Sequence, residues 1–402
     1  MPNHEVIVVG GGPAGVTAAL AFAHQKPALA ERIVVLERDH YPRDKYCAGG
    51  LGGRADRALA RLGVHVDVPS VAIRGMSATT LDGEVSDRAG VIGRVVRRIE
   101  FDHALARIAR TRGIQVVEGA RVTALSFHDE EVVAESTKGA FHGRVVIGAD
   151  GVGSIVRRAL GLPFGRLRAQ AVEVDTEPVA TDRPRDMLHF DLDDHSYAGY
   201  AWDFPTLIDG APMVCRGVYV LHPGALSRSA SDEAFAGGDP DALLRAHLRK
   251  RGLDPARYRF KRFAERGLAA GLTMARPRAL LVGEAAGIDP LFGEGIAQAI
   301  AYGVLAGAYL APRLDAGALD FTDWDQHIQR SRLGADLRVR RRLVRRFYGR
   351  DRVRIERGVA ASPSLLRFGL HHFSGDRMPM NEGMRAFVAA LSLYARLRLP
   401  VP

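Results

Sequence analysis

Three glycines near the start of the chain, Gly10, Gly12 and Gly15, have the spacing of a phosphate-binding turn. Gly10 permits a tight turn, Gly12 lets the backbone approach a pyrophosphate, and Gly15 allows a helix to pack closely on a strand. Such a motif indicates a dinucleotide site only between a strand and a helix. Residues 5–9 are apolar, as in a buried strand, and residues 14–25 are Ala-rich and helical in pattern. The context favours phosphate binding at the helix N-terminus over a purely structural turn.

An acidic residue completes this signature. Residues 32–37 form a second apolar strand that ends in Glu37, 22 residues after Gly15. A carboxylate at this spacing is placed to accept hydrogen bonds from an adenosine ribose. We therefore expect a βαβ nucleotide-binding unit, in which Pro13, Ala14 and Arg38 also contact the nucleotide.

Two later strands end in similar turns. Residues 145–149 are apolar and lead to Asp150-Gly151, and residues 280–283 lead to Gly283-Glu284. A carboxylate in a glycine-flanked turn after a buried strand can reach the hydroxyls of a cofactor, although an ordinary β-turn has the same composition.

These three segments, in this order, resemble the flavoprotein family that includes para-hydroxybenzoate hydroxylase. The resemblance covers roughly residues 5–315 and implies bound FAD. It implies that Asp150 lies near the pyrophosphate and that Glu284, where the family usually has Asp, contacts the ribityl chain. The family also has an Arg shortly before a Phe-Asp pair, which Arg98 and Phe101-Asp102 match; Arg97 is the neighbouring alternative.

A further glycine-rich segment follows the third turn. After Pro290, the residues Gly293, Gly295 and Ile296 begin a long uncharged stretch that we expect to be helical. The resemblance places this segment at the flavin ring. A helix N-terminus there would stabilise the negative charge of reduced flavin around N1 and O2, by up to about 2 kcal/mol when partly buried.

Two segments resemble the geranylgeranyl reductases within this family. The loop at residues 41–51 carries Cys47 followed by Ala48 and Gly49, and the resemblance implies that they lie beside the flavin. The segment Tyr200-Ala201-Trp202-Asp203-Phe204-Pro205 matches their Tyr-x-Trp-x-Phe-Pro motif, which implies a substrate cavity lined by Tyr200, Trp202, Phe204 and Pro205. Apolar aromatic walls suit an isoprenoid chain.

The resemblance implies a reductase. FAD would be reduced by NAD(P)H or another small electron carrier, and would pass a hydride to one carbon of an isolated C=C bond. A proton would reach the other carbon, and Cys47 or a bound water is the candidate source. An isolated alkene accepts hydride poorly, so positioning and a nearby acid must contribute much of the acceleration.

Other interpretations of these residues stay open. Cys47 could be a small buried residue, the aromatic side chains could be ordinary core, and Cys215 is interpreted as structural. An FAD-dependent monooxygenase of an apolar or aromatic metabolite shares every FAD motif. A flavin-dependent halogenase is a weaker alternative, because Tyr200 and Phe204 depart from its motif and Lys45 is no persuasive counterpart of its catalytic lysine.

The sequence predicts an α/β fold. We expect a Rossmann-like FAD-binding domain with an inserted β-sheet-rich substrate domain and a C-terminal helical region. The expected FAD-binding domain comprises residues 1–165, with an excursion toward the substrate near 68–95, and residues 271–315. The sheet-rich domain would span 166–270 and the helical region 316–402. Within these, we expect a helix from Phe101 and a hairpin from residues 120–127 and 131–137.

Composition bounds the remaining possibilities. The chain has 402 residues, a net charge of +10 and only two Cys, which are too few for a disulfide framework. We therefore expect a cytoplasmic protein without a signal peptide, and the uncharged stretch from Gly295 to Pro312 is too short and polar to predict a membrane span. The histidines form no metal-ligand pattern, and no nucleic-acid motif accompanies the positive charge.

The positive charge is concentrated toward the end of the chain. Residues 338–357 contain ten Arg interleaved with Leu, Val, Phe and Tyr. A solvated basic helix explains this pattern, and so does a helix that lies on a membrane surface near a lipid substrate. The second explanation implies peripheral association with a membrane surface. The sequence leaves the oligomeric state open.

Overall fold

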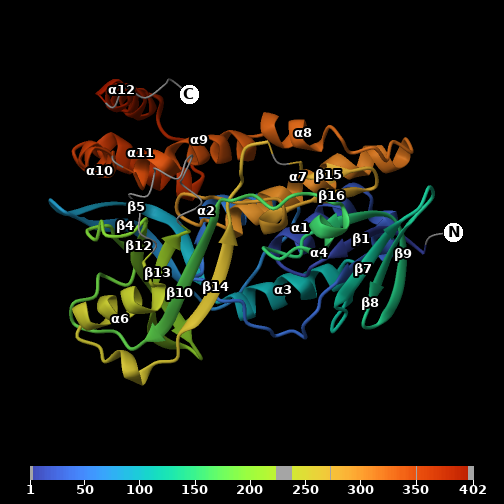
Figure 1. Ribbon diagram of the computed structural model, residues 1–402, viewed down its shortest axis with the longest axis horizontal. Coiled ribbons are helices and arrows are strands. Elements are labelled where there is room, and N and C mark those ends of the chain that lie inside the picture. The colour runs from blue at the N-terminus through green and yellow to red at the C-terminus, as the bar shows by residue number, and fades with distance from the viewer. Residues whose placement is uncertain (1–2, 223–237, 272, 350, 397–402) are drawn as a thin grey trace.

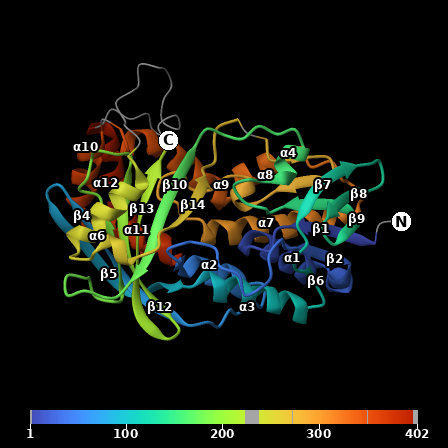
Figure 2. The ribbon, with the colours of Figure 1, turned by 60° about the horizontal axis from the view of Figure 1, so that its bottom comes forward.

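The computed structural model describes residues 3–222, 238–271, 273–349 and 351–396. It is a mixed α/β structure with a Rossmann-type sheet, a second sheet and a C-terminal helical layer, as the sequence predicts. Figures 1 and 2 show the two sheets at opposite ends of the long axis, with the last helices over the second sheet.

The first sheet, sheet A, is built on short apolar strands that the sequence alternates with helices. Its main strand order is β15-β16-β9-β1-β2-β6. The core strands β16, β9, β1, β2 and β6 run parallel. The strands are β1 (His4–Val9), β2 (Ile33–Leu36), β6 (Gln115–Val117), β9 (Gly139–Gly148), β15 (Ala275–Arg276) and β16 (Ala279–Leu281). The predicted hairpin is present as β7 (Val122–Phe127) and β8 (Val132–Ser136), which extends β9.

Helices α1 (Pro13–Gln25) and α7 (Ile296–Asp315) pack against each other through small residues. A Cβ on Gly303 would lie 2.7 Å from the Ala14 carbonyl oxygen, and one on Gly307 would lie 2.5 Å from the Ala21 Cβ. The uncharged residues 296–312 of α7 are therefore explained by a largely buried helix. No helix among the described residues is long and apolar enough to cross a membrane.

Helix α3 (Arg98–Thr111) begins three residues earlier than the apolar pattern indicates. Phe101, Leu105 and Ala109 form its buried face, as their spacing predicts. The earlier start places Arg98 in the first turn, one turn before Asp102. Because Arg98 and Asp102 are four residues apart on the helix, their side chains can form an ion pair.

The second sheet, sheet B, combines strands from two separate parts of the chain. Its order is β14-β10-β13-β12-β11-β4-β5-β3, and all neighbours are antiparallel except the β11–β4 pair. The early strands are β3 (Gly50–Gly52), β4 (Ser70–Thr80) and β5 (Gly83–Val96). The later ones are β10 (Arg168–Thr176), β11 (Met187–Asp191), β12 (Gly199–Ile208), β13 (Ala211–Leu221) and β14 (Lys261–Arg266).

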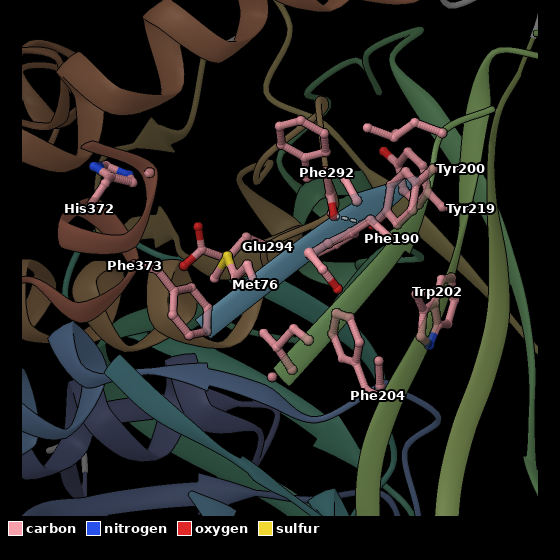
Figure 3. Close-up of a pocket in the computed structure, with 18 of the residues that line it drawn as sticks. Met76, Phe190, Tyr200, Trp202, Phe204, Tyr219, Phe292, Glu294, His372 and Phe373 are labelled. Atoms are coloured by element: carbon pink, nitrogen blue, oxygen red, sulfur yellow. Dashed lines mark hydrogen bonds between the residues drawn. The ribbon is translucent and has the colours of Figure 1, made fainter. Parts of the chain in front are cut away.

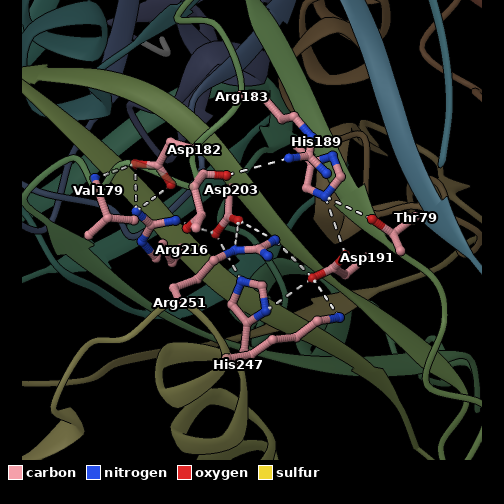
Figure 4. A network of polar contacts seen from close by, with 12 residues as sticks. Thr79, Val179, Asp182, Arg183, His189, Asp191, Asp203, Arg216, His247 and Arg251 are labelled. Carbon is pink, nitrogen blue, oxygen red and sulfur yellow. Dashed lines mark hydrogen bonds and ion pairs between the residues drawn. The ribbon is translucent and has the colours of Figure 1, made fainter. Parts of the chain in front are cut away.

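One face of sheet B is covered by α6 (Pro240–Lys250), and a buried ion network lies beneath this helix (Figure 4). Arg216 of β13 pairs with Asp203 at 2.9 Å and with Asp182 at 2.7 Å. His247 of α6 contacts Asp203 at 2.8 Å and Asp191 at 3.4 Å. In the described residues, no group of three or more His, Cys, Asp or Glu could hold a metal ion. The network therefore fastens α6 to the sheet by charge pairing.

The other face of sheet B lies under the C-terminal helices. These are α9 (Arg332–Phe347), α10 (Arg352–Ala360), α11 (Pro363–Ser374) and α12 (Met380–Arg396). The preceding helix α8 (Trp324–Arg330) packs instead on the core of sheet A, where the Trp324 indole N–H donates to the Leu281 carbonyl of β16 at 3.1 Å. The Arg-rich segment is thus two helices rather than one solvated helix. Arg352 is buried and bonds to Glu356 and to the carbonyls of Tyr197 and Leu192. Part of the predicted basic surface therefore serves internal packing.

The remaining short elements complete the connections. They are α2 (Gly53–Ala60), α4 (Ile155–Ala159) and the 3-10 turns η1 (Pro27–Arg32), η2 (Pro255–Arg257) and η3 (Gly283–Ala285). Residues 223–237 of the predicted sheet-rich domain and residues 397–402 of the predicted helical region lie outside the described residues.

Candidate active site

The parallel strands of sheet A place all three sequence signatures at one edge. The carboxyl ends of β1, β2, β9 and β16 lead to Gly10, Glu37, Asp150 and Gly283, respectively. Ligands of open α/β sheets bind at this edge. Segments 273 residues apart in the sequence, at Gly10 and Gly283, therefore contribute to one site.

The glycine turn has the expected geometry. Gly10 has a φ of +107°, and a Cβ there would collide with the Ala149 carbonyl oxygen. A Cβ on Gly15 would collide with the Gly10 carbonyl oxygen, whereas Gly12 faces open space. Gly12 precedes α1 and has no side chain to cap the helix. The first N–H groups of α1 are consequently available to an anion, such as a pyrophosphate.

Glu37 is buried at the end of β2 and holds the turn in place. Its Oε2 accepts the backbone N–H of Gly11 at 3.0 Å and pairs with Arg43 at 3.0 Å. Its Oε1 accepts the backbone N–H of Asp39 at 3.0 Å. The neighbouring Arg38 side chain is exposed and pairs with Asp39. Glu37 is therefore fixed beside the glycine turn, and Arg38 points toward solvent.

A chain of buried charges connects Glu37 to the start of α3. Arg98 makes two 2.7 Å hydrogen bonds to Asp102, and Asp102 also pairs with Arg43 at 3.0 Å. Burial alone would lower the pKa of Arg98, but Asp102 reverses the direction and raises it. Arg97 pairs instead with Asp175 of sheet B at 2.8 Å. Arg98 is therefore a fixed cation of sheet A's edge, whereas Arg97 faces sheet B.

Asp150 is used mainly to shape its own turn. Its carboxylate accepts the Ser154 hydroxyl at 2.5 Å and the backbone N–H groups of Ile155 at 2.6 Å and Val156 at 3.1 Å, which begin α4. Burial raises the pKa of Asp150 despite these bonds. Gly151 has a φ of +78°, and a Cβ there would lie 3.5 Å from Glu284 Oε2.

Arg157 joins this second turn to the third one. It is fully buried, and its guanidinium donates to the carbonyls of Ala285 at 2.8 Å and Ala286 at 3.4 Å. Glu284 pairs with Lys45 at 3.0 Å, so the third turn also contacts the Cys47 loop. Arg157 belongs to the second motif, but its hydrogen-bond partners Ala285 and Ala286 belong to the third.

The Gly293–Ile296 segment is shaped by a buried aspartate. Asp289 accepts the backbone N–H groups of Leu291 at 2.7 Å and Phe292 at 3.2 Å. It also pairs with Arg340 of α9, which in turn pairs with Glu294 at 3.0 Å. Pro290 is buried and its carbonyl accepts the Tyr219 hydroxyl at 3.2 Å. The C-terminal helices therefore hold the segment that leads into α7.

An aromatic cavity of about 380 Å³ lies between sheet B and the C-terminal helices (Figure 3). At one end it is lined by the Cys47 loop and by the segment from Gly293 to Ile296. Its walls are sheet B and α11. The aromatic side chains that line it are Phe190, Tyr200, Trp202, Phe204, Tyr219, Phe263, Phe292 and Phe373.

The alternation of β12 explains which residues of the Tyr-x-Trp-x-Phe-Pro motif reach this cavity. Tyr200, Trp202 and Phe204 share one face and line it. The Tyr200 hydroxyl donates to the Phe292 carbonyl at 2.6 Å, which joins the sheet to the flavin-side segment. The expectation that Pro205 lines the cavity is wrong. Side chains alternate along the strand, so Pro205 lies on the opposite face, in a small pocket with Asp182 and Asp203.

Cys47 lines the cavity as a neutral thiol. Burial raises the pKa of Cys47, with a smaller lowering by Arg98. Its backbone N–H donates to Glu173 Oε1 at 2.8 Å, and its Sγ accepts the Gly49 N–H at 3.4 Å. Burial and the nearby Asp175 raise the pKa of Glu173 to about 7. Cys215 is buried beside Glu173, at 3.7 Å from its Oε2.

Glu265 is a functional candidate that the sequence reasoning missed. It lies on β14 and lines the cavity, and its buried Oε2 has no hydrogen-bond partner among the described residues. A Cβ on Gly293 would lie 2.5 Å from this oxygen. Burial, and next the negative charge of Glu284, raise the pKa of Glu265 well above its usual value. The site therefore places, beside the Gly293 segment, a buried carboxyl group whose surroundings favour its protonated form.

These features fit an FAD molecule along the edge of sheet A. The uncapped N-terminus of α1 would hold the pyrophosphate, and Glu37 stands at the adenosine side. Glu284 lies between the glycine turns and the cavity, where Gly293 and Cys47 would face the flavin ring. The fit rests on the open space at Gly12 and on the unpartnered Glu265 oxygen that faces the same end of the cavity.

Comparisons with known proteins agree with this geometry. A family described as "FAD binding domain" matches residues 3–316. A menaquinone reductase of Mycobacterium tuberculosis is 31% identical over 343 residues, which cover 77% of each chain. A digeranylgeranylglycerophospholipid reductase of Methanococcoides burtonii is 27% identical and covers 77% of this chain and 74% of its own.

Solved structures share the fold at low identity. A geranylgeranyl bacteriochlorophyll reductase-like protein from Thermoplasma acidophilum has a TM-score of 0.71 at 19% identity, over 99% of both chains. A flavin-dependent brominase also has a TM-score of 0.71, at 17% identity, over 98% of this chain and 99% of its own. The fold is therefore common to reductases and halogenases, so the cavity must distinguish between them.

Proposed function

We propose that this chain, which belongs to the FAD-binding domain family, saturates C=C bonds of an isoprenoid chain of the geranylgeranyl type. It is an FAD-dependent oxidoreductase with geranylgeranyl reductase-like relatives. The observation that supports this substrate is the aromatic cavity, which runs from the Cys47 loop and Gly293 to α11. An elongated apolar molecule fits such a space, with one end at the flavin side.

The cavity residues would position the double bond. Reduced FAD, when bound, supplies a hydride for one of the two carbons. Tyr200, Trp202 and Phe204 would hold the chain by apolar contact, while the Tyr200 hydroxyl is occupied by the Phe292 carbonyl. This wall therefore offers the substrate few polar partners. In a site that excludes water, the orientation of the double bond toward the flavin would determine the rate.

We assign the proton to Glu265 rather than to Cys47. Addition of a hydride to one alkene carbon requires a proton at the other, and Glu265 Oε2 would supply it and become a carboxylate. Solvent would then restore the proton. Burial and the negative charge of Glu284 raise the pKa of Glu265 well above its usual value, which favours the protonated form that can donate. Its Oε2 has no hydrogen-bond partner among the described residues, whereas the Cys47 Sγ accepts the Gly49 N–H.

The reductant is a separate part of the proposal. We expect NAD(P)H or another small two-electron carrier to reduce the flavin before the alkene reacts. The sequence has no second glycine-rich nucleotide motif, so the donor would bind transiently at the flavin side rather than in a second nucleotide domain.

An anaerobic single turnover tests the proposal. The FAD-loaded protein is reduced with dithionite and mixed with a geranylgeranyl compound, and the product mass is measured. A gain of two hydrogen atoms with reoxidation of the flavin supports the reductase. Reaction only after oxygen is admitted, with addition of one oxygen atom, would instead establish the monooxygenase.

A further inference from the structure

Helix α12 presents an apolar stripe to solvent. Met380, Met384, Phe387, Val388 and Leu391 are 86, 59, 58, 57 and 39% exposed, respectively. Their spacing of four, three, one and three residues places them on one face of the helix. We call these five residues the α12 stripe. In Figure 1, α12 is the outermost helix above α10 and α11.

The stripe is separate from the face that anchors α12. Ala386 is buried, and Leu393 packs against Gly358 of α10 and the aromatic core beneath it. The helix is therefore already attached to the protein through its opposite side. Contiguous exposed apolar surface of this kind marks an interaction site rather than spare core.

The surroundings of the stripe are basic. Arg377, Arg385 and Arg396 are exposed before and along α12, and Glu382 is its only acidic residue. Glu382 lies 3.7 Å from Arg367 of α11. On α9, Arg342 is exposed. Burial, and next Arg342, lower the pKa of neighbouring Arg341. Burial raises the pKa of Tyr394 of α12, and Arg342 opposes this rise, so Arg342 lies near α12. Apolar residues bordered by arginines are complementary to an anionic lipid surface.

The cavity reaches the surface beside the same helices. Leu366 and Gly369 of α11 line it together with Val85 and Ser86 of β5, and Gly369 and Ser86 are exposed. Helix α11 contacts β5 on one side and α12 on the other. If the protein binds a surface through the α12 stripe, the cavity opening would therefore lie close to that surface.

We propose that the α12 stripe and its arginines dock the protein on the surface of an anionic lipid bilayer. Insertion of Met384, Phe387 and Val388 into the headgroup boundary would bury the apolar side chains, while the arginines face lipid phosphates. A second copy is a poorer occupant, because it would bring two basic rims together. The supply of a lipid substrate through the opening rests on the proposed function, whereas docking itself does not.

Vesicle sedimentation of the full-length, FAD-loaded protein tests the docking. Vesicles of phosphatidylcholine alone are compared with vesicles that also contain phosphatidylglycerol. We expect binding to the anionic vesicles, at least tenfold weaker binding to the neutral ones, and release by high salt, which screens charge. Lack of binding to anionic vesicles overturns the proposal.

Substitutions locate the surface. The triple variant Met384→Gln, Phe387→Gln, Val388→Gln should bind anionic vesicles at least tenfold more weakly. A matched control replaces Leu81 and Val91, which are 54 and 53% exposed on the β4–β5 hairpin, by Gln and should bind as the unmodified protein does. Equal binding by the triple variant and the control would overturn the assignment to α12.

Two further readouts separate the alternatives. A lipid-free dimer that the triple variant abolishes would assign the stripe to a second copy and overturn membrane docking. Sedimentation requires neither substrate nor turnover, so failure of the isoprenoid assay would contradict the proposed function and leave a positive docking result intact.

Discussion

Arg340 of α9 forms an ion pair with Asp289, the residue that shapes the turn before Gly293, although 51 residues separate them. Asp289 is fully buried, and the same guanidinium also pairs with Glu294. The C-terminal region is therefore part of the flavin-side architecture and not only a cover for sheet B.

Replacement of Arg340 should disrupt this end of the site. Arg340→Ala leaves the buried carboxylates of Asp289 and Glu294 without their cation, and breaking a buried pair costs about 3–5 kcal/mol. We expect lower thermal stability and at least tenfold weaker FAD retention, measured by absorbance after gel filtration. Arg342→Ala, at an exposed position of the same helix, is the control. Unchanged FAD retention by Arg340→Ala would contradict the assigned role.

Replacement of Glu265 should slow proton transfer and leave cofactor binding intact. Glu265→Gln preserves size and removes the acidic proton, so single-turnover alkene reduction should slow by about 10²–10⁴-fold. FAD content and the rate of dithionite reduction should not change.

The pH profile provides a second readout for Glu265. Because its pKa is raised, the acid form persists to higher pH than in an ordinary glutamic acid and is lost as the pH rises through the raised value. The alkaline decline in rate should therefore disappear in Glu265→Gln. Turnover of that variant at the unmodified rate would assign the proton to another group.

The local motifs of the cofactor edge could be predicted from the sequence. Gly10, Gly12, Gly15 and Glu37 act through neighbouring backbone and strand ends, so spacing alone carries the information. Strands β4 and β5, which include most of the predicted excursion near residues 68–95, lie within sheet B, beside strands from residues 168–266.

The residues that sequence reasoning missed act across distance. Glu265 lines the cavity and Glu173 bonds to the Cys47 loop because of cross-strand register, and Arg340 reaches Asp289 through the packing of α9. A charged residue within an apolar strand, such as Glu173, was an available signal, but it does not specify which face is the cavity. Pro205 differs from these residues, because strand alternation alone places it on the face opposite Tyr200, Trp202 and Phe204, and the sequence contains that pattern.

Cys47 should react slowly with thiol reagents. The thiolate is the reactive form, and burial raises the pKa of this thiol. Maleimide labelling of the FAD-free protein should be slow at neutral pH and accelerate roughly tenfold per pH unit as the pH rises. Cys47→Ala should remove the faster-labelled site and leave the buried Cys215. Rapid labelling of Cys47 at neutral pH would contradict a neutral thiol.

The ion network under α6 should make stability depend on pH. Burial alone would lower the pKa of His247, but its hydrogen bonds to Asp191 and Asp203 raise it. Its contribution is therefore complete below the ordinary imidazole pKa of about 6.5 and is lost as the pH rises through the raised value. Burial would raise the pKa values of Asp191 and Asp203, but His247 and Arg251 help to lower them. The carboxylate contribution is present above about pH 4 and is lost in stronger acid.

Replacement of His247 measures this contribution. His247→Gln should reduce the free energy of unfolding by about 3–5 kcal/mol near pH 5–6, and by less as the pH rises above that range. Denaturant unfolding at several pH values gives the difference. His24→Gln, at an exposed position of α1, should show no such trend. A pH-independent loss in His247→Gln would indicate a packing effect alone.

The strand order of sheet A has a consequence for synthesis on the ribosome. Strands β1, β2 and β6 emerge early, but the edge of β9 at Val146–Gly148 pairs with β16, which is made more than 130 residues later. Strand β4 likewise pairs with β11 only after about 190 residues have been made. A half-synthesised chain therefore carries two unfinished sheets with open edges, the kind of intermediate that aggregates unless a chaperone shields it.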